Sequence, residues 1–401
     1  MNKLEELIQQ YCPDGVEWKT LAEVCQKVFA GGTPTSSNSS YYGGDIPWLR
    51  SGEVNFNEIN STERTITEEG YNSSSAKWIE KHSVLIAMTG ATVARSAMTM
   101  IDLTANQSVC ALTPDRSILY YRYLYYWISR SYIQLKGMAQ GALTSLNLNI
   151  IKAIEIPVPP LPVQEEIVRI LDNFTELQAE LQAELQKRKL QYNYYLDNLL
   201  NFNRGGYQAE VRWMKLKDIG KVCMCKRILK SQTSSSGDVP FFKIGTFGGN
   251  ADAYISQALF NEYKAKYSYP QKGDVLISAA GTIGRTIVFD GTPSYFQDSN
   301  IVWLKHDGSI VLNSYLRYCY ALNPWVVSTG GTIARLYNDN ILEATIPVPS
   351  LANQQKIVNI LDRFDALTTD LTQGLPAEIE KRRQQYEYYR DKLLTFKRKA
   401  V

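Results

Sequence analysis

Two stretches of this chain are nearly the same: residues 156–174 read IPVPPLPVQEEIVRILDNF, and residues 346–364 read IPVPSLANQQKIVNILDRF. At an offset of 190 positions, 12 of these 19 residues are identical. A second pair, KRKLQYNYYLDNLLNF at 187–202 and KRRQQYEYYRDKLLTF at 381–396, shares 10 of 16 residues at an offset of 194. Two such matches in the same order identify an internal duplication, and a duplication determines the architecture.

The regions between the repeats correspond more loosely. The segment IPWLR at 46–50 recurs as VPFFK at 239–243, and VLIA at 84–87 recurs as VLIS at 275–278. The matched pieces keep their apolar positions, whereas the stretches between them differ freely. Short β-rich runs bounded by turn residues are typical of mixed α+β domains. We therefore expect one scaffold that carries two different surfaces.

The repeats predict long helices. Residues 163–202 contain no proline or glycine, and apolar residues recur at steps of four and three, which is typical of a coiled-coil seam. The second copy keeps this spacing until GLP at 374–376, which predicts a break or a kink. The proline-rich stretches at 156–162 and 346–349 predict stiff, extended entries to the helices. Because both copies carry the same stripe, we expect the two helices to pair. The alternative is that each helix packs on its own domain.

The N-terminal segment LEELI at 4–8 stands before Val16 much as LLNF at 199–202 stands before Val211. It is therefore predicted to continue the final repeat at 393–396. The predicted fold class is α+β, with two similar domains separated by two long antiparallel coiled-coil helices in a pseudo-two-fold cyclic arrangement.

The composition is that of an ordinary globular chain, with 44% hydrophobic and 21% charged residues among 401. No run of 18 apolar residues predicts a membrane-spanning helix, and the opening MNKLEE has acids where a signal peptide needs an apolar stretch. The six cysteines have spacings that fit neither a disulfide framework nor a zinc site. We interpret them as reduced thiols in a cytoplasmic protein.

Motifs that suggest enzymes are incomplete. Asp14 stands too close to Glu17 and Lys19 for a metal-dependent nuclease site, and Asp14-Gly15 is typical of a turn. The segment NPW at 323–325 lacks the second proline of an adenine methyltransferase loop, and no GxxxxGK[ST] motif is present. The two histidines are isolated. We therefore expect no catalytic residues and no metal site. The net charge of +3 does not by itself indicate nucleic-acid binding.

Four short motifs carry a resemblance to a known family: GGTP at 31–34, YGGDIPW at 42–48, ANQSVC at 105–110 and QEEI at 164–167. With the helix entry at 156–159, they resemble the specificity (S, HsdS) subunits of type I restriction–modification enzymes. The resemblance covers the whole chain. The second domain is the weaker match. It lacks GGTP, and it has QDSN at 297–300 where the first domain has NQS at 106–108.

The resemblance implies four parts: a first target recognition domain at 1–155, a helical spacer at 156–206, a second target recognition domain at 207–345 and a second helical region at 346–401. It also implies a non-catalytic subunit without a cofactor, in which each domain reads one half of a bipartite, asymmetric double-stranded DNA site. Two modification subunits would bring S-adenosylmethionine and methylate adenine, and restriction (motor-nuclease) subunits would use ATP. The alternative is a coiled-coil adaptor whose two globular domains bind proteins.

Direct reading of bases needs Arg or Lys for guanine, Asn or Gln for adenine, and small polar side chains nearby. The candidates in the first domain are Thr33, Ser37, Asn38, Arg50, Thr89, Thr92, Arg95, Gln140, Thr144 and Ser145. Those in the second domain are Lys226, Arg227, Lys230, Lys243, Thr282, Arg285, Thr332 and Arg335. Arg95 and Arg285 are the strongest, because both follow the matched apolar strand at a similar distance.

Two further sets of side chains lie on the predicted helices. The basic clusters at 187–189 and 381–383 indicate either a solvated helix face or phosphate contact. The tyrosines at 192–195 and 386–389 are expected to pack helix on helix or on modification subunits.

Overall fold

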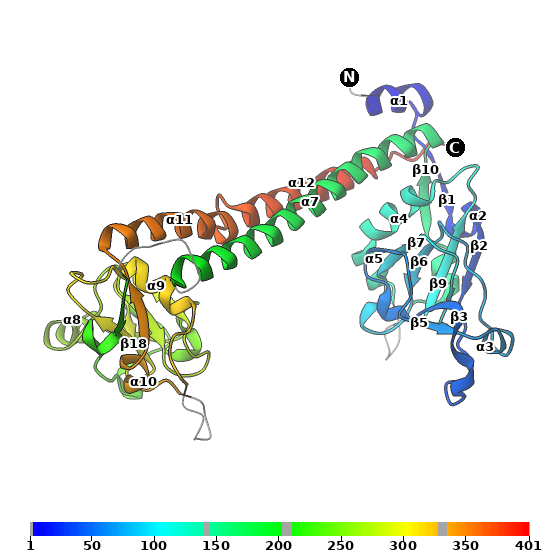
Figure 1. Ribbon diagram of the computed structural model, residues 1–401. Helices are drawn as coiled ribbons and strands as arrows, with labels where there is room; N and C mark the ends of the chain where they lie inside the picture. The colour runs from blue at the N-terminus through cyan, green and yellow to red at the C-terminus, as the bar shows by residue number, and fades with distance from the viewer. Residues whose placement is uncertain (1–2, 140–144, 203–210, 328–334, 401) are drawn as a thin grey trace. The chain divides into compact units, whose positions relative to one another are not determined.

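The computed structural model describes residues 3–139, 145–202, 211–327 and 335–400. The chain divides into two compact units. Unit 1 comprises Met1–Gln182 and Ile379–Val401, and unit 2 comprises Ala183–Glu378. Figure 1 shows the elements of both units. Within the described ranges, no helix has the length and apolar character needed to cross a membrane.

The first domain, in unit 1, is built on two sheets. The larger sheet has five strands in the order β2 (Cys25–Ala30), β9 (Val109–Pro114), β6 (Val84–Ala87), β7 (Ser96–Thr99) and β4 (Asn57–Ile59). The smaller sheet has three, in the order β5 (Arg64–Ile66), β3 (Tyr42–Leu49) and β8 (Thr104–Ala105). The apolar run at 84–87 is fully buried, as its lack of alternation predicts.

Helices complete the first domain. They are α1 (Lys3–Tyr11), α2 (Leu21–Val24), α3 (Glu68–Asn72), α4 (Tyr121–Arg130), α5 (Tyr132–Gly137) and α6 (Leu148–Lys152). Tyr123 and Leu124 of α4 are fully buried in the main hydrophobic core, together with Val84 and Ile86 of the large sheet. The amphipathic helix α4 therefore covers one face of that sheet.

The second domain, in unit 2, repeats this plan with fewer strands. Its larger sheet has the order β12 (Lys221–Met224), β18 (Ile301–Lys305), β15 (Val275–Ser278) and β16 (Thr286–Val288). Its smaller sheet has the order β14 (Tyr254–Ile255), β13 (Val239–Phe242) and β17 (Tyr295–Phe296). Its helices are α8 (Gln257–Lys266), α9 (Asn313–Ala321) and α10 (Asn338–Leu342). The described part of this domain has no counterpart of β4.

The proline-rich entries to the helices are strands. In unit 1, β10 (Glu155–Val158) pairs antiparallel with β1 (Glu17–Thr20), so that Trp18 faces Pro157. In unit 2, β19 (Thr345–Val348) pairs in the same register with β11 (Arg212–Lys215). The extended conformation predicted for these entries is confirmed. In addition, each entry pairs with a strand at the start of its domain.

The long helices follow these strands directly. Helix α7 spans Leu161–Leu200, while the second copy is divided into α11 (Leu351–Thr369) and α12 (Leu375–Leu393). The division confirms the break predicted at 374–376. A Cβ on Gly374 would lie 2.6 Å from the carbonyl oxygen of Ala366, so this close approach requires glycine.

The helices pack on one another in both units. In unit 1, Phe174 of α7 stacks on Tyr389 of α12 with ring centroids 5.5 Å apart. In unit 2, Tyr195 of α7 stacks on Phe364 of α11 at 5.2 Å. Residue numbers in the partner helix fall as those in α7 rise, so the pairing is antiparallel. This confirms the predicted helix pairing and the packing role of these two tyrosines.

The expected seam is wrong at the first turns of each helix. Val163 and Ile167 belong to the core of the first domain, and Ile357 belongs to that of the second. At these positions the apolar stripe packs on its own domain: α11 packs on α9, and Asp172 of α7 bonds Tyr126 and Arg122 of α4. Mutual pairing of the helices begins further along.

The two ends of the chain meet in unit 1. Val16 forms a parallel bridge with Arg398, and its backbone N–H donates to the carbonyl of Lys397 at 2.9 Å. Leu4 of α1 shares the first core with Leu394. The segment after α12 thus joins the first domain, as Leu196 and Leu199 join the core of the second. The N-terminal segment thus continues the final repeat, as the sequence predicts.

Candidate nucleic-acid interface

Backbone hydrogen bonds gather several chain segments at one edge of the first domain. Gly32 donates to the carbonyl of Ala105 at 2.8 Å, and Asn106 donates to that of Leu49 at 2.9 Å. Met88 donates to Ser108 and receives from Leu146, both at 2.8 Å. We call residues 31–33, 49–50, 88–95, 105–108 and 145–146 the first-domain edge. It forms where four strands end, and buried residues such as Met88 and Val93 anchor its segments in the core of the domain.

The first-domain edge brings together six of the predicted residues. They are Thr33, Arg50, Thr89, Thr92, Arg95 and Ser145, all half-buried. The Thr33 hydroxyl donates to the Gln107 side chain, and the Arg95 guanidinium donates to the Asn55 side chain at 2.9 Å. Polar side chains from separate segments therefore meet on this edge.

The other four residues predicted in the first domain do not belong to this set. Ser37 and Asn38 lie on the loop between Thr33 and β3, where the Asn38 side chain accepts the Ser40 N–H at 3.1 Å. That bond caps the short 3-10 helix Ser39–Tyr41, so Asn38 has a structural role. Gln140 and Thr144 lie outside the described residues.

The second domain has an equivalent edge. Gln297 donates to the carbonyl of Phe242 at 2.9 Å, and Ala279 donates to that of Asn300 at 2.8 Å. Leu336 donates to the carbonyl of Ala279 at 2.9 Å. We call residues 226–230, 242–243, 279–285, 297–300 and 335–336 the second-domain edge.

This edge carries more positive charge. Arg227, Lys230 and Lys243 line one cavity of about 450 Å³ beside Gln297–Asn300. Arg335 adjoins it, since its guanidinium donates to the Ser299 carbonyl at 2.8 Å. Lys226, Thr282 and Arg285 also belong to the edge and are exposed, while Thr332 lies outside the described residues.

Two predicted pairs occupy equivalent places. Ala87 donates to the carbonyl of Arg95, and Ser278 donates to that of Arg285, both at 2.9 Å. Each arginine therefore ends the turn that follows the matched apolar strand. Arg50 and Lys243 are equivalent too, because each follows the last residue of the central strand of its small sheet.

The side-chain partners differ between the equivalent positions. Whereas Arg95 bonds a side-chain amide, Arg285 donates to the backbone carbonyl of Gly248 at 3.3 Å. The turn before the arginine is one residue shorter in the second domain. The turn ends at Ala94 with φ +66° in the first domain and at Gly284 with φ +79° in the second. The scaffold is thus shared, and the groups it presents are not.

Sequence reasoning missed three residues on or beside these edges. Gln107 accepts from Thr33, Gln297 accepts from the Ile244 N–H at 2.9 Å, and Asn55 holds Arg95. Gln107 and Gln297 fall within motifs that the sequence analysis singled out, so their positions were a usable signal. Asn55 had none, because it reaches Arg95 only through the fold.

The thiols near these edges are buried. Burial raises the pKa of Cys225 to about 12, and it raises the pKa of Cys110 to about 12. Both side chains therefore stay protonated near neutral pH and are poor nucleophiles. All six cysteines are free, as the sequence predicted.

The basic clusters on the helices have acidic partners. Arg188 pairs with Glu184 at 2.7 Å, and Arg383 pairs with Glu380 and Glu387, each at 2.7 Å. These pairs within one helix favour a solvated helix face. Phosphate contact by the clusters stays a prediction.

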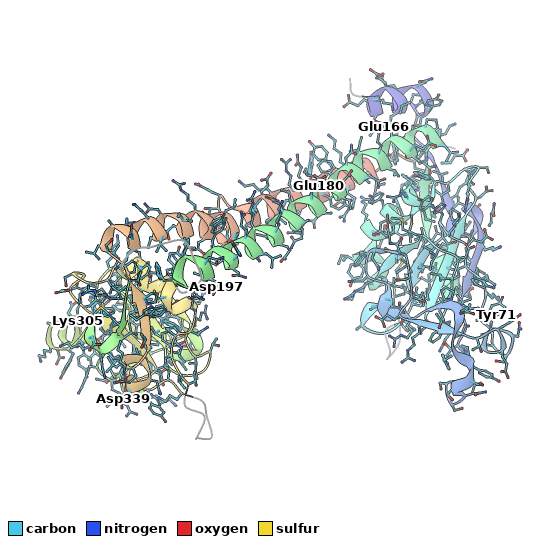
Figure 2. All side chains as sticks on the ribbon, in the orientation of Figure 1. Tyr71, Glu166, Glu180, Asp197, Lys305 and Asp339 are labelled. Atoms are coloured by element: carbon cyan, nitrogen blue, oxygen red, sulfur yellow. The ribbon has the colours of Figure 1, made fainter. Side chains whose placement is uncertain are left out.

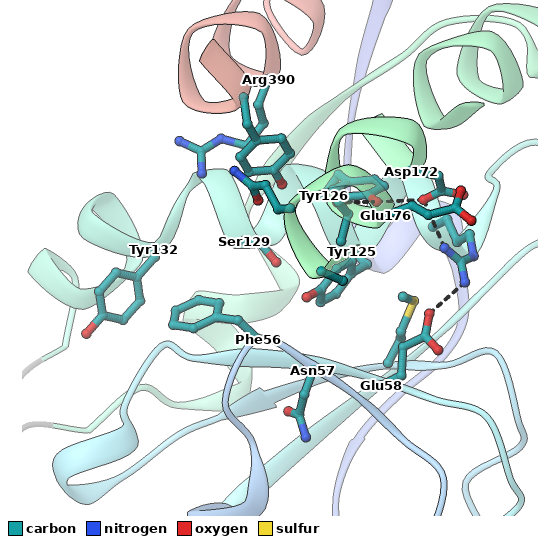
Figure 3. Close-up of a pocket in the computed structure, with 16 residues that line it drawn as sticks. Phe56, Asn57, Glu58, Tyr125, Tyr126, Ser129, Tyr132, Asp172, Glu176 and Arg390 are labelled. Atoms are coloured by element: carbon teal, nitrogen blue, oxygen red, sulfur yellow. Dashed lines mark hydrogen bonds and ion pairs between the residues drawn. The ribbon is translucent and has the colours of Figure 1, made fainter. Parts of the chain in front are cut away.

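A larger cavity, of about 740 Å³, lies where the first domain meets α7 and α12 (Figure 3). Arg122 of α4 links Asp172 of α7, at 2.9 Å, to Glu58 of β4, at 2.6 Å. The Tyr126 hydroxyl also donates to Asp172, at 2.6 Å. These bonds fix the domain on its helix. In unit 2, the Tyr318 hydroxyl makes the corresponding bond to Asp362 at 2.5 Å.

Comparison with known proteins gives this architecture a family. The model of the type I restriction modification DNA specificity domain matches residues 13–188 and 209–381. A Haemophilus influenzae protein, provisionally named a type I restriction enzyme specificity subunit, is 45% identical over 95% of this chain and 96% of its own length. The Escherichia coli EcoR124I/EcoR124II specificity subunit is 31% identical over 73% and 74%.

A solved structure shares the fold. Its subject is the complex assembly and conformational transition of the type I restriction–modification system. One chain in it matches with a TM-score of 0.66 at 19% identity, over 95% of this chain and 98% of that one. The chain therefore belongs to the specificity subunits of type I restriction–modification systems, the non-catalytic subunits that determine which DNA target is recognised.

Proposed function

We propose that this chain reads a bipartite, asymmetric double-stranded DNA site, one half with the first-domain edge and the other with the second-domain edge. The observation that carries this proposal is the equivalence of the two edges combined with their different side chains. Equivalent backbone positions place polar side chains in the same way in both domains, and different side chains select different bases. A duplicated reader with identical edges would instead suit a symmetric site.

Within this proposal, Arg95 and Arg285 read bases or anchor the site from equivalent turns. Arg50 and Lys243 act from the ends of the small-sheet strands, and both residue types suit guanine. Thr33, Thr89, Thr92 and Ser145 add small polar contacts in the first half-site. Arg227, Lys230 and Arg335 face the second half-site, where the excess of cations makes phosphate contact and salt dependence larger.

Catalysis belongs to other subunits. In type I systems, S-adenosylmethionine and ATP are used by the modification and restriction subunits, and the specificity subunit carries no cofactor. For this chain, we propose two modification subunits that methylate adenine within the site and restriction subunits that cleave unmodified DNA. The division at 1–155, 156–206, 207–345 and 346–401 and the cytoplasmic location remain part of the proposal.

The test is to co-express the chain with its modification subunits and map the methylated motif. Exchange of residues 12–155 for the matching domain of another specificity subunit should change one half of the motif and preserve the other. The matched control exchanges residues 207–345 and should change the opposite half. A change in both halves after either exchange would contradict the assignment of one half-site to each domain. Methyl transfer by the purified chain alone would contradict its non-catalytic role.

A further inference from the structure

At each edge, the cation that follows the central strand of the small sheet pairs with an acid from outside the edge. Arg50, directly after β3, pairs with Glu63, the residue directly before β5. The exposed fraction of the side chain is 40% for Arg50 and 64% for Glu63. The pair stands beside Asn106, whose backbone bonds Leu49, so it lies within reach of whatever the first-domain edge binds.

The second-domain edge has an equivalent ion pair. Lys243, directly after β13, pairs with Asp252 at 2.8 Å, with side chains 42% and 58% exposed. Lys243 also lines the cavity with Arg227 and Lys230. Of these three cations, Lys243 is the one that the structure shows in an ion pair.

The two acids occupy the same topological position. In the first domain Trp48 pairs with Arg64, and Glu63 is the residue before Arg64. In the second, Phe241 donates to the carbonyl of Ala253 at 2.8 Å, and Asp252 is the residue before Ala253. The segments between cation and acid, 51–62 and 244–251, differ in length. The acid has therefore kept its place on the strand and not its distance along the chain.

Stability does not account for this recurrence. An exposed ion pair contributes about 0–1 kcal/mol, so neither domain needs it to fold. A carboxylate beside a cation has two other effects at a DNA-binding edge. It restricts the rotamers of a long side chain, and it repels phosphate. A cation held in this way loses less conformational entropy when it binds a base. It also gains less binding free energy from a sequence-independent contact with the DNA phosphates.

We propose that Glu63 and Asp252 are specificity-determining residues. Each carboxylate holds the neighbouring cation, Arg50 or Lys243, in position to donate to a base with several hydrogen-bond acceptors, such as guanine. We call each of these two ion pairs a carboxylate latch. The inference rests on the proposed reading of one half-site by each domain. Arg50 can keep one N–H on Glu63 and offer others to a base, because its guanidinium is a planar fork. Lys243 is a point donor, so Asp252 and the base share one ammonium group.

The variants are Glu63→Gln and Asp252→Asn, each with a control that removes the same charge from an exposed ion pair elsewhere in its domain. Glu80 pairs with Lys27 at 2.6 Å and is 50% exposed, so Glu80→Gln is the control for the first domain. Glu262 of α8 pairs with Lys266 at 3.0 Å and is 50% exposed, so Glu262→Gln is the control for the second.

The measurement is equilibrium binding of the complex with its modification subunits, at fixed salt, to the parent site and to sites with single base changes in either half. Glu63→Gln should lower discrimination about tenfold at one position of the first half-site and leave the second half unchanged. Asp252→Asn should do the reverse. The controls should change discrimination less than twofold.

Equal effects of a variant and its control would overturn the latch, because net charge alone would explain them. Unchanged discrimination in Glu63→Gln and Asp252→Asn would overturn it as well. A parent complex without sequence-specific binding would overturn the proposed function and the latch together. That outcome is distinct from the first two, in which the parent discriminates normally.

Discussion

A buried glutamine joins each domain to its long helix through the same contacts in the two units, whereas the contacts at the two edges differ. In unit 1 the Gln164 side chain accepts the Tyr120 N–H at 2.8 Å and donates to the carbonyls of Ile118 and Pro159 at 2.8 and 2.7 Å. In unit 2, Gln354 makes the three corresponding bonds, each at 2.9 Å. Arg95 and Arg285, by contrast, share a backbone position and bond different groups. After the duplication, the contacts that hold a helix to its domain were kept, and the outward groups diverged.

The largest expected effect comes from replacing the buried glutamines Gln164 and Gln354. Gln164→Leu and Gln354→Leu should each destabilise their own unit by about 3 kcal/mol, because one N–H and two carbonyls lose their partners in a buried site. Hydrogen exchange resolved by residue should show the loss in the unit that carries the change and not in the other.

The exposed neighbour Gln355 is the control, and Gln355→Leu should change stability by less than about 0.5 kcal/mol. Unequal costs of the two buried substitutions would contradict the claim that the joints are equivalent.

The edges can be compared by removing their arginines. Arg95→Ala and Arg285→Ala should each weaken site-specific DNA binding of the assembled complex by about 1–3 kcal/mol while the fold stays intact. Binding to single-base variants of each half-site is the measurement.

Arg116 serves as the control, because it is exposed in the first domain and bonds only the carbonyl of Lys81 among the contacts that the structure gives it. Loss of affinity for all sequences alike in both arginine variants would assign them to phosphate contact and would contradict base reading.

One joint position differs between the repeats and has a smaller expected effect. Glu166, which is labelled on α7 in Figure 2, is buried. It pairs with Arg169 at 2.7 Å and with Lys3 of α1 at 3.0 Å, while the corresponding residue in the second repeat is Lys356. Hydrogen bonding to Arg169 and then to Lys3 lowers the pKa of Glu166 from its usual 4.5 to about 2. A lowered pKa in the folded state stabilises the fold above pH 4.5, and this contribution is lost as the pH falls from 4.5 toward 2.

Glu166→Gln should therefore destabilise unit 1 by about 1 kcal/mol at pH 7, since the cationic partners are exposed and screened, and by less at pH 2.5. Urea unfolding at both pH values measures the difference. Glu165→Gln, at the exposed neighbour on the same helix, is the matched control. A constant difference between parent and Glu166→Gln at both pH values would rule out the ionised carboxylate as the cause.

The sequence predicted the elements whose signals are local. The helix expected at 163–202 is Leu161–Leu200, and the strands expected at 84–87 and 275–278 are β6 and β15. Periodicity and the absence of proline determine such elements without tertiary information. The break at 374–376 was predictable for the same reason. The antiparallel pairing of the helices followed from a stripe that both copies carry.

The rest depended on contacts between distant segments. The pairing of β10 with β1 joins residues about 140 positions apart, and a proline-rich stretch gives no local sign of it. Val163 and Ile167 have the spacing of a coiled-coil seam but lie in the core of the first domain, because an apolar stripe does not specify its partner. Glu63 and Asp252 could not be matched by alignment, since the loops before them differ in length. Among the edge residues, the matched positions of Arg95 and Arg285 were predicted, but their partners were not.

The meeting of the chain's two ends has a consequence for synthesis on the ribosome. Unit 2 is one continuous segment of roughly 200 residues, so it can fold as soon as it has emerged. Unit 1 includes most of α12 and the bridge between Val16 and Arg398, and these C-terminal residues follow unit 2 in the chain. At about 5–20 residues per second, the first domain waits about 10–40 s for these residues. The domain that is made first is thus completed last, and for that interval the apolar face that later receives Leu394 is open to chaperones or to another nascent copy.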